Sequence, residues 1–287
     1  MAGGGALILL RVVHRTGYEY TGTASHSFNE ARMSPRSTLH QQVLHTKVDI
    51  TPTAWTNTYV DYWGTTVTQF EVHEPHQRLS VTASSTVDVQ RPQVEGQGMT
   101  WSDVRSPQVF DDLSEYLLQS RSVEPPEDLK ERVAQIAARA EGPTACAREI
   151  VDLIHDEMTY VSGSTGVHTR AAEAWAGRSG VCQDMSNLTI GCLRSVGIPA
   201  CYVSGYLLPA REPEIGKPYK GESHAWIRWW DGEWVGMDPT NAIQPGARHV
   251  EVARGREYGD VPPLRGIYTG TKSSAMFVEV ELTALRA

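Results

Sequence analysis

The hydrophobic pattern of this 287-residue chain changes its period near residues 92–107. Before this segment apolar and polar residues alternate, as in Val81–Val89, and a period of two is typical of a strand with one buried face. After it apolar residues recur at helical spacing, with Ile150, Leu153 and Ile154 on one face. The segment itself is rich in Pro and Gly, which favours a linker. The chain is therefore predicted to be α+β, with a β-rich part followed by a part of helices and then strands.

Residues 1–95 are predicted to form an antiparallel β-sandwich domain. This part is rich in β-branched and aromatic residues, is punctuated by Gly, Pro and Asn, and shows no helical periodicity. The expected strands are Leu7–Tyr20, Gln42–Thr51, Asn57–Val60, Thr65–Val72 and Arg78–Gln90. Its histidines have no ligand spacing, which favours ordinary surface or half-buried residues over a site. They are His14, His26, His40, His45, His73 and His76.

Residues 96–287 are predicted to form the second domain, in which helices precede a sheet. Pro and acidic residues open one of the helices at Pro125, where the positive end of the helix dipole favours them. The expected helices are Asp111–Gln119, Pro125–Ala140, Thr144–Glu157, Thr169–Ala176 and Cys182–Val196. The expected strands are Cys201–Leu208, His224–Trp229, Glu233–Met237 and Met276–Leu282.

Charge and cysteine content narrow the classes of function. The chain has 26 Lys and Arg against 34 Asp and Glu, a net charge of −8, so we expect no nucleic-acid partner and no membrane partner. The apolar run Leu7–Leu10 is short and meets Arg11 at once, so it is predicted to be neither a secretory signal nor a membrane span. Four cysteines without a Cys-x-x-Cys pair favour a reduced compartment. A cytoplasmic location is the expectation.

Cys182 is the candidate nucleophile. Gly180 breaks the chain before it and Gly197 ends the following helix, so the cysteine is expected in the first helical turn. Unpaired backbone N–H groups and the helix dipole stabilise a thiolate at that place. The alternative is a buried structural thiol, because free cysteine is among the most buried residue types.

His224 and Asp238 are the candidate base and its partner carboxylate. Trp230-Asp231-Gly232 suits a three-residue hairpin loop, and that register places Trp229 opposite Glu233 and His224 opposite Asp238. Opposed residues share one face of a sheet, and a carboxylate beside an imidazole fixes its tautomer and stabilises its charged form. The alternatives are a solvent-facing histidine and an ordinary turn carboxylate. Together with Cys182 the pair makes a nucleophilic triad.

At this point the chain resembles a known family, the bacterial transglutaminase-like proteins of the papain-like cysteine enzyme superfamily. The motifs that carry the resemblance are Gly-Val-Cys-Gln-Asp at 180–184, Ser-His-Ala-Trp at 223–226 and Asp-Pro-Thr-Asn at 238–241. Flanking segments at 197–206 and 256–268 are also similar, as are several N-terminal motifs such as Asp-Tyr-Trp-Gly at 61–64. Thr65 and Trp175 depart from the family pattern. Trp175 is expected to pack in the core, with shaping of the cleft as the alternative.

The resemblance implies acyl transfer through a thioester on an amide, either a glutamine carboxamide or a peptide bond. Cys182 attacks the carbonyl, His224 gives its proton to the departing amine, and an amine or water takes the acyl group. The implied partners are a peptide or protein amide substrate and a primary amine acceptor. Hydrolysis as a cysteine peptidase or amidase, and a non-catalytic peptide-binding module, stay open as alternatives. The oligomeric state is not predicted.

The oxyanion is expected to bind the backbone N–H of Cys182 and a second donor, for which Gln183 and Tyr160 are candidates. No cofactor and no metal are expected. Calcium has no acidic loop in the sequence, and a zinc set of Cys182, Cys192, Cys201 and His224 fails on spacing. The aromatic residues beside the catalytic strands are expected in the core, with a wall of the cleft as the alternative. They are Trp226, Trp229, Trp230 and Trp234.

Overall fold

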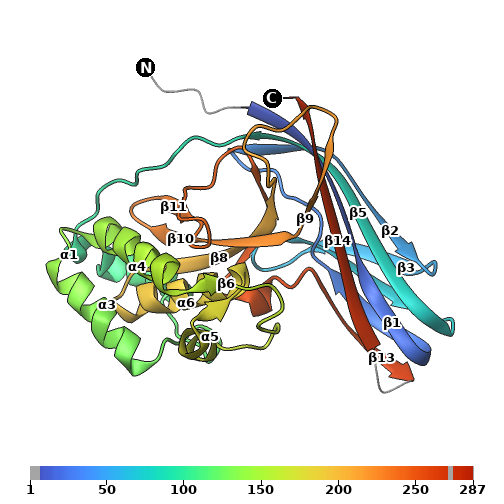
Figure 1. Cartoon of the computed structure of the whole chain (residues 1–287), viewed down its shortest axis with the longest axis horizontal. Coiled ribbons are helices and arrows are strands. Elements are labelled where there is room, and N and C mark those ends of the chain that lie inside the picture. The colour runs from blue at the N-terminus through green and yellow to red at the C-terminus, as the bar shows by residue number, and fades with distance from the viewer. Residues whose placement is uncertain (1–6, 271–273, 287) are drawn as a thin grey trace.

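The structure of this chain is a computed structural model that describes residues 7–270 and 274–286. Helices gather at one end of the molecule and long strands at the other, with a small central sheet between them (Figure 1). The predicted α+β class is confirmed. In the described part of the chain, no helix is both long and apolar enough to cross a membrane.

One strand organises the N-terminal sheet. β1 spans Leu7–Ala31, so it is longer than predicted, and its two halves have different neighbours. The first half pairs with β5 (His76–Gln90) and with the C-terminal strand β14 (Ser274–Arg286). The second half pairs with β4 (Thr66–Val72) and β13 (Leu264–Gly270). A single antiparallel sheet of eight strands therefore curls around its own apolar face.

The expected β layer is thus one curled sheet whose two halves share β1. A separate apolar cluster fills the curl, with Phe70, Leu79 and Val81 fully buried between the halves. The outer strands complete the sheet, with β2 (Gln41–Thr51) on β5, β3 (Trp55–Val60) on β4 and β9 (Pro218–Gly221) on β14.

The second part is built on an antiparallel sheet of four strands in the order β11-β10-β8-β12. Their bounds are Trp234–Met237, Ser223–Trp230, Ala200–Leu207 and His249–Gly255. The remaining elements are helices, short turns and one two-residue pair of strands. They are α1 (Trp101–Val104), α2 (Pro107–Leu113), η1 (Ser114–Tyr116), α3 (Glu127–Arg139), α4 (Pro143–Glu157), β6 (Thr159–Tyr160), α5 (Ala171–Gly177), β7 (Ser179–Gly180), α6 (Cys182–Ser195) and η2 (Tyr258–Asp260).

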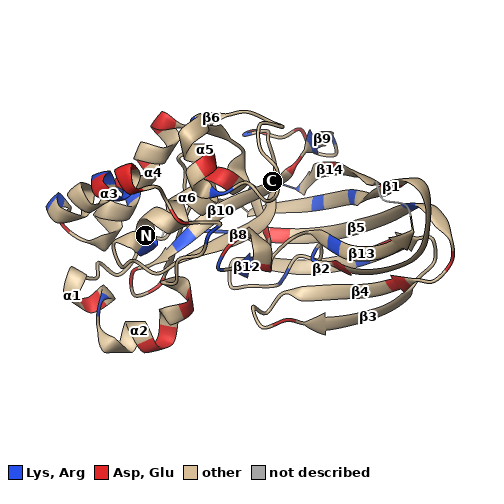
Figure 2. Cartoon of the chain, turned by 90° about the horizontal axis from the view of Figure 1, so that it is seen from below, with Lys and Arg blue, Asp and Glu red and all other residues tan. Residues whose placement is uncertain are grey.

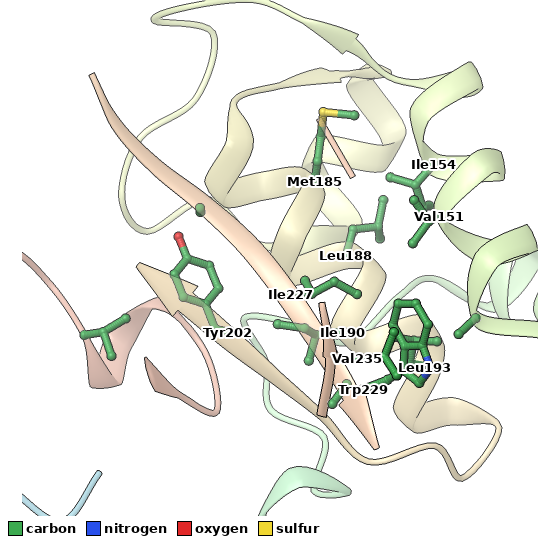
Figure 3. Close-up of a cluster of buried hydrophobic side chains, with 14 of the residues drawn as sticks. Val151, Ile154, Met185, Leu188, Ile190, Leu193, Tyr202, Ile227, Trp229 and Val235 are labelled. Atoms are coloured by element: carbon green, nitrogen blue, oxygen red, sulfur yellow. The ribbon is translucent and has the colours of Figure 1, made fainter. Parts of the chain in front are cut away.

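Helix α6 is the centre of this second part. Every residue from Asp184 to Arg194 is buried, so the helix is surrounded on all sides. Met185 and Leu188 belong to one continuous apolar cluster with Ile154 of α4 and Ile227 of β10 (Figure 3). This packing holds the helix rigidly, and with it the position of its first residue.

The chain returns to the N-terminal sheet at its C-terminal end. β14 pairs with β1 from Leu9 to Tyr20, and Leu282 and Ala284 are buried there. β13 and β14 therefore belong to the sheet that residues 1–95 were predicted to form alone. We accordingly propose a division into two structural units that is discontinuous in sequence, with β13 and β14 in the first.

Candidate active site

Cys182 is the first residue of helix α6, as the sequence predicts. The carboxylate of Asp184 accepts a hydrogen bond from the backbone N–H of Val181 at 2.8 Å and so fixes the start of the helix. A Cβ atom at position 180 would lie 2.7 Å from the Cβ of Asp184, so glycine is the residue that fits there. The backbone N–H groups of the first turn have no acceptor within the helix. They can therefore donate hydrogen bonds to a negatively charged group at the helix start.

His224 lies at the start of β10, beside the thiol. The sulfur of Cys182 is 4.0 Å from the carbonyl oxygen of Ser223, the residue before this histidine. Nε2 of His224 is 2.6 Å from Oδ2 of Asp238, which leaves Nδ1 for the side-chain hydrogen bond with Cys182. The three predicted residues therefore come together, with the imidazole between the thiol and the carboxylate.

The hairpin that joins these residues has a different register from the predicted one. Trp229 lies opposite Val235 rather than Glu233, and the loop is Asp231–Glu233 with Gly232 at a φ of +77°. The shift is two residues, so it preserves which face each side chain occupies. β11 ends at Met237, and Asp238 reaches His224 diagonally across that shared face. The predicted pairing was wrong, whereas the predicted face was right.

Asp238 is a fully buried carboxylate in a dense set of donors. Its Oδ1 accepts from the backbone N–H groups of Thr240 and Asn241, and its Oδ2 from the side chains of His224, Asn241 and His249. Burial alone would raise the pKa of Asp238, but the hydrogen bonds from both histidines outweigh it and lower the pKa well below its usual range. The group is therefore a carboxylate held in one orientation.

The environment of His224 favours its charged form. Burial alone would lower the pKa of His224, but hydrogen bonds to Asp238 and Cys182 and their charges raise it to about 10. A protonated imidazole beside the sulfur stabilises a thiolate, and its proton is then available to a leaving group. The geometry thus supports nucleophilic attack followed by proton delivery.

His249 is a residue of this site that the sequence reasoning missed. It lies on β12, is almost fully buried, and its Nδ1 accepts from the backbone N–H of Gly246 at 3.2 Å. That bond places the proton on Nε2, which lies 3.4 Å from Oδ2 of Asp238. Burial first of all lowers the pKa of His249, so this second histidine is neutral. An irregular segment separates His249 from Asp238 in the sequence. The closeness of the two residues is therefore apparent only from the pairing of β12 with β8.

A cavity of about 830 Å³ opens over Cys182 and His224. The N-terminal sheet supplies one wall of it, through His14, Thr16 and Tyr18 of β1. Deep clefts between structural units are common binding sites. Residues far apart in sequence therefore share the site.

His14 is buried at this wall, contrary to the expectation of an ordinary surface or half-buried residue. Its Nδ1 is 2.9 Å from the hydroxyl of Tyr206, and its Nε2 is buried without a hydrogen-bond partner among the described residues. Burial lowers the pKa of His14 to about 4, so the ring is neutral.

The two candidates for the second oxyanion donor both line the cavity and both have partners. The amide of Gln183 donates to the carbonyl of Val167 at 3.3 Å, and the hydroxyl of Tyr160 donates to Glu222 at 3.2 Å. Burial raises the pKa of Tyr160 to about 12, so its hydroxyl keeps its proton.

Two of the four tryptophans beside the catalytic strands lie in the core as expected, and the other two are half-buried. Trp226 and Trp229 are fully buried, and Trp230 contacts Trp234 edge to face. Trp175 is also buried, and its Nε1 donates to Asp128 at 3.2 Å. None of the described tryptophans lines the cavity over Cys182.

Three potential metal ligands do meet, although they are not the discounted zinc set. His224, Asp238 and His249 bring their ligand atoms within 4.8 Å of one another. Nδ1 of His249 is engaged by Gly246, and Oδ2 of Asp238 already accepts from both rings and from Asn241. Hydrogen bonding accounts for this arrangement.

Known proteins resemble this chain in both of its parts. A model of the bacterial transglutaminase-like N-terminal region matches residues 10–88, and a model of the transglutaminase-like superfamily matches residues 130–239. An uncharacterised protein of Mycobacterium leprae is 40% identical over 276 residues, which cover 96% of this chain and 99% of that protein. An uncharacterised protein of Mycobacterium tuberculosis is 36% identical over 293 residues, with 95% of this chain and 91% of that protein covered.

A solved structure has the same fold over nearly the whole chain. It is described as "a Putative Cysteine Protease from Cytophaga hutchinsonii", has a TM-score of 0.81 and 22% identity, and the match covers 99% of this chain and 93% of that one. At this identity the likeness shows the fold alone.

Proposed function

Because this chain belongs to the transglutaminase-like superfamily, a family of cysteine enzymes, we propose that it transfers acyl groups from an amide through a thioester on Cys182. The observation that carries the proposal is the hydrogen-bonded chain of Cys182, His224 and Asp238, of which Cys182 and His224 line the cavity. Cys182 is half-buried and lines the cavity, whereas the other free cysteines are buried.

In the first half of the reaction the thiolate of Cys182 attacks the carbonyl carbon of a glutamine carboxamide or a peptide bond. The backbone N–H of Cys182 and a second donor stabilise the oxyanion. The C–N bond breaks, His224 gives its Nδ1 proton to the departing nitrogen, and ammonia or an amine leaves. The product is a thioester on Cys182.

In the second half an acceptor attacks the thioester. A primary amine gives its proton to His224, the C–S bond breaks, and the thiolate of Cys182 is restored beside the imidazolium. Asp238 keeps the ring oriented and its charge compensated throughout. Water in place of the amine gives hydrolysis by the same residues. Transfer is favoured by the cavity wall that His14 and Tyr18 contribute, because a walled site limits the access of water.

The test is an acyl-exchange assay with a peptide library and a primary amine, read by mass. Transfer predicts peptides that have gained the amine and lost ammonia. Cleavage of the peptide, or replacement of ammonia by water at the carboxamide, indicates hydrolysis instead. Cys182→Ala should abolish the products and His224→Ala should nearly abolish them, whereas His45→Ala, which removes an exposed histidine from β2, should leave them unchanged. Products of equal yield with Cys182→Ala would remove the cysteine from the mechanism.

A further inference from the structure

A second cavity, of about 300 Å³, lies at the junction of the two structural units and is lined by four arginines. Arg36 and Arg91 come from the N-terminal part, and Arg228 and Arg254 come from β10 and β12. None of its lining residues lines the cavity over Cys182. Figure 2 shows β12 close to β2 at this junction, where Gln41 donates to the backbone of β12 at 2.7 Å.

Three of these arginines converge on one carboxylate beneath the cavity. Glu251 is fully buried, and its oxygens lie 2.6 Å from Arg228, 2.5 Å from Arg254 and 3.8 Å from Arg91. Burial alone would raise the pKa of Glu251, but the charges of Arg228 and Arg254 outweigh it and lower it. A single negative charge is therefore shared among three positive ones.

The other charged residues at this cavity do not neutralise its excess of positive charge. Arg36 adds a fourth positive charge, and its Nε and that of Arg91 are buried without a hydrogen-bond partner among the described residues. Among the described residues that line this cavity, the carboxylate is that of Glu233, and it is exposed. Four guanidinium groups thus face two carboxylates, Glu251 included, an excess of two positive charges. Buried charge without compensation destabilises a fold.

The positive charges of this cluster lower the pKa of titratable groups at the cavity. Burial lowers the pKa of Arg91 to about 10, and the charges of Arg228 and Arg254 add to the effect. Burial and the charges of Arg91 and Arg228 also lower the pKa of His40, at the cavity wall. The site would accept negative charge that the protein itself does not supply.

We propose that this junction cavity binds a small divalent oxyanion, a phosphate or sulfate group, through Arg36, Arg91, Arg228 and Arg254. The excess of two positive charges matches such a group, and the planar donor fork of arginine suits its oxygens. The bound anion would join the N-terminal sheet to β10 and β12, since the four arginines come from both units. The proposal is independent of the reaction at Cys182.

The direct test is thermal unfolding of the whole chain at neutral pH in sodium phosphate, sodium sulfate or sodium acetate, against sodium chloride of equal ionic strength. Phosphate and sulfate stabilise many proteins without binding, in a way that does not saturate. Specific binding predicts a saturable rise of a few degrees in Tm with phosphate and sulfate and a smaller rise with acetate. No saturable rise over chloride would overturn the proposal, and an equal rise with acetate would overturn its divalent character.

Two pairs of variants locate the site. Leu39 is 97% exposed at the mouth of the cavity, so Leu39→Glu adds a competing carboxylate without disturbing the core, and Leu39→Gln is its neutral match. Arg36→Gln removes one donor, and Arg15→Gln removes a charge from the exposed face of β1. Titration calorimetry with phosphate should show at least tenfold weaker binding for Leu39→Glu and Arg36→Gln and unchanged binding for the matches. Unchanged binding with Leu39→Glu would place the anion elsewhere and overturn the assignment, even if Arg36→Gln fails to fold.

Discussion

Two opposed influences act on the charge of His224. Burial favours the neutral ring, and hydrogen bonding to Asp238 and Cys182 favours the charged one, with a net rise of the pKa to about 10. The sequence identified all three residues, because a cysteine at a helix start and a histidine at a strand start leave local signals. His249 leaves none, since its role depends on β12 lying next to β8.

Replacing Asp238 by asparagine should lower the pKa of His224. The substitution keeps the shape of the side chain but removes the negative charge, so the burial of the ring then dominates. NMR titration of the imidazole should show protonation persisting to about pH 10 in the wild type and lost at a much lower pH in Asp238→Asn. A pKa of His224 that does not change would mean that Asp238 is not its charge partner.

His14 should make the protein less stable in acid. Its folded pKa of about 4 lies below its unfolded value of 6.5, so the unfolded state binds more protons between these values. The stabilisation is present above pH 6.5 and is lost as the pH falls toward 4, by about 3 kcal/mol in total.

Denaturant unfolding at several pH values tests this expectation. His14→Gln cannot titrate, so its free energy of unfolding should fall less steeply between pH 6.5 and 4 than that of the wild type. Some slope should remain, because burial also lowers the pKa of His249. Exposed His45→Gln is the control, and identical slopes for wild type and His14→Gln would refute the account.

At the scale of elements, periodicity predicted strands of the N-terminal sheet, and the glycines at 180 and 197 predicted the bounds of helix α6. It missed β12 and β13 for physical reasons. Glu251 and His249 of β12 point into a buried polar layer, so their pattern resembles that of an exposed segment. β13 is mostly exposed and contains glycine, so it carries little strand signal. The hairpin register was mispredicted because the glycine lies at the second rather than the third loop position.

The hairpin loop also fixes the segment that links the two parts. Asp231 is fully buried, and its carboxylate accepts from the backbone N–H groups of Gly98 at 3.0 Å and Met99 at 2.6 Å. Hydrogen bonds to a charged group contribute roughly 1.5–3 kcal/mol each. The predicted linker is therefore docked onto the central sheet.

Asp231→Ala should accordingly lower the free energy of unfolding by about 2–4 kcal/mol, because both linker N–H groups lose their acceptor. Chemical denaturation measures the change. Glu233→Ala alters an exposed residue of the same loop and should change stability by less than about 0.5 kcal/mol. Equal effects of the two substitutions would show that the linker is not held through Asp231.

At the scale of the whole molecule, local sequence patterns could not predict that strands beyond residue 95 join the N-terminal sheet. Local patterns do not say that Ser274–Arg286 pairs with β1, since a strand carries no record of its partner. The pairing joins β14 to β1, which contributes a wall of the cavity over Cys182.

The fragment 96–287 should therefore not fold cooperatively by itself. Without β1, strand β14 loses its partner from Leu9 to Tyr20, and Leu282 and Ala284 become exposed. Circular dichroism and thermal melting of the fragment should show no sharp transition, whereas mixing it with fragment 1–95 should restore one. A sharp transition of 96–287 alone would show that β14 is dispensable for folding.

The central claim is that Cys182 forms the thioester. The measurement that tests it most directly is single-turnover acylation by a peptide amide, quenched in acid, with the modified residue located by peptide mapping and mass. The wild type should carry the acyl group on Cys182, Cys182→Ala should carry none, and His224→Ala nearly none. Asp238→Ala should retain measurable acylation, because orientation and charge compensation are partial contributions. Acylation that persists in Cys182→Ala, or a harsher loss in Asp238→Ala than in His224→Ala, would contradict the account.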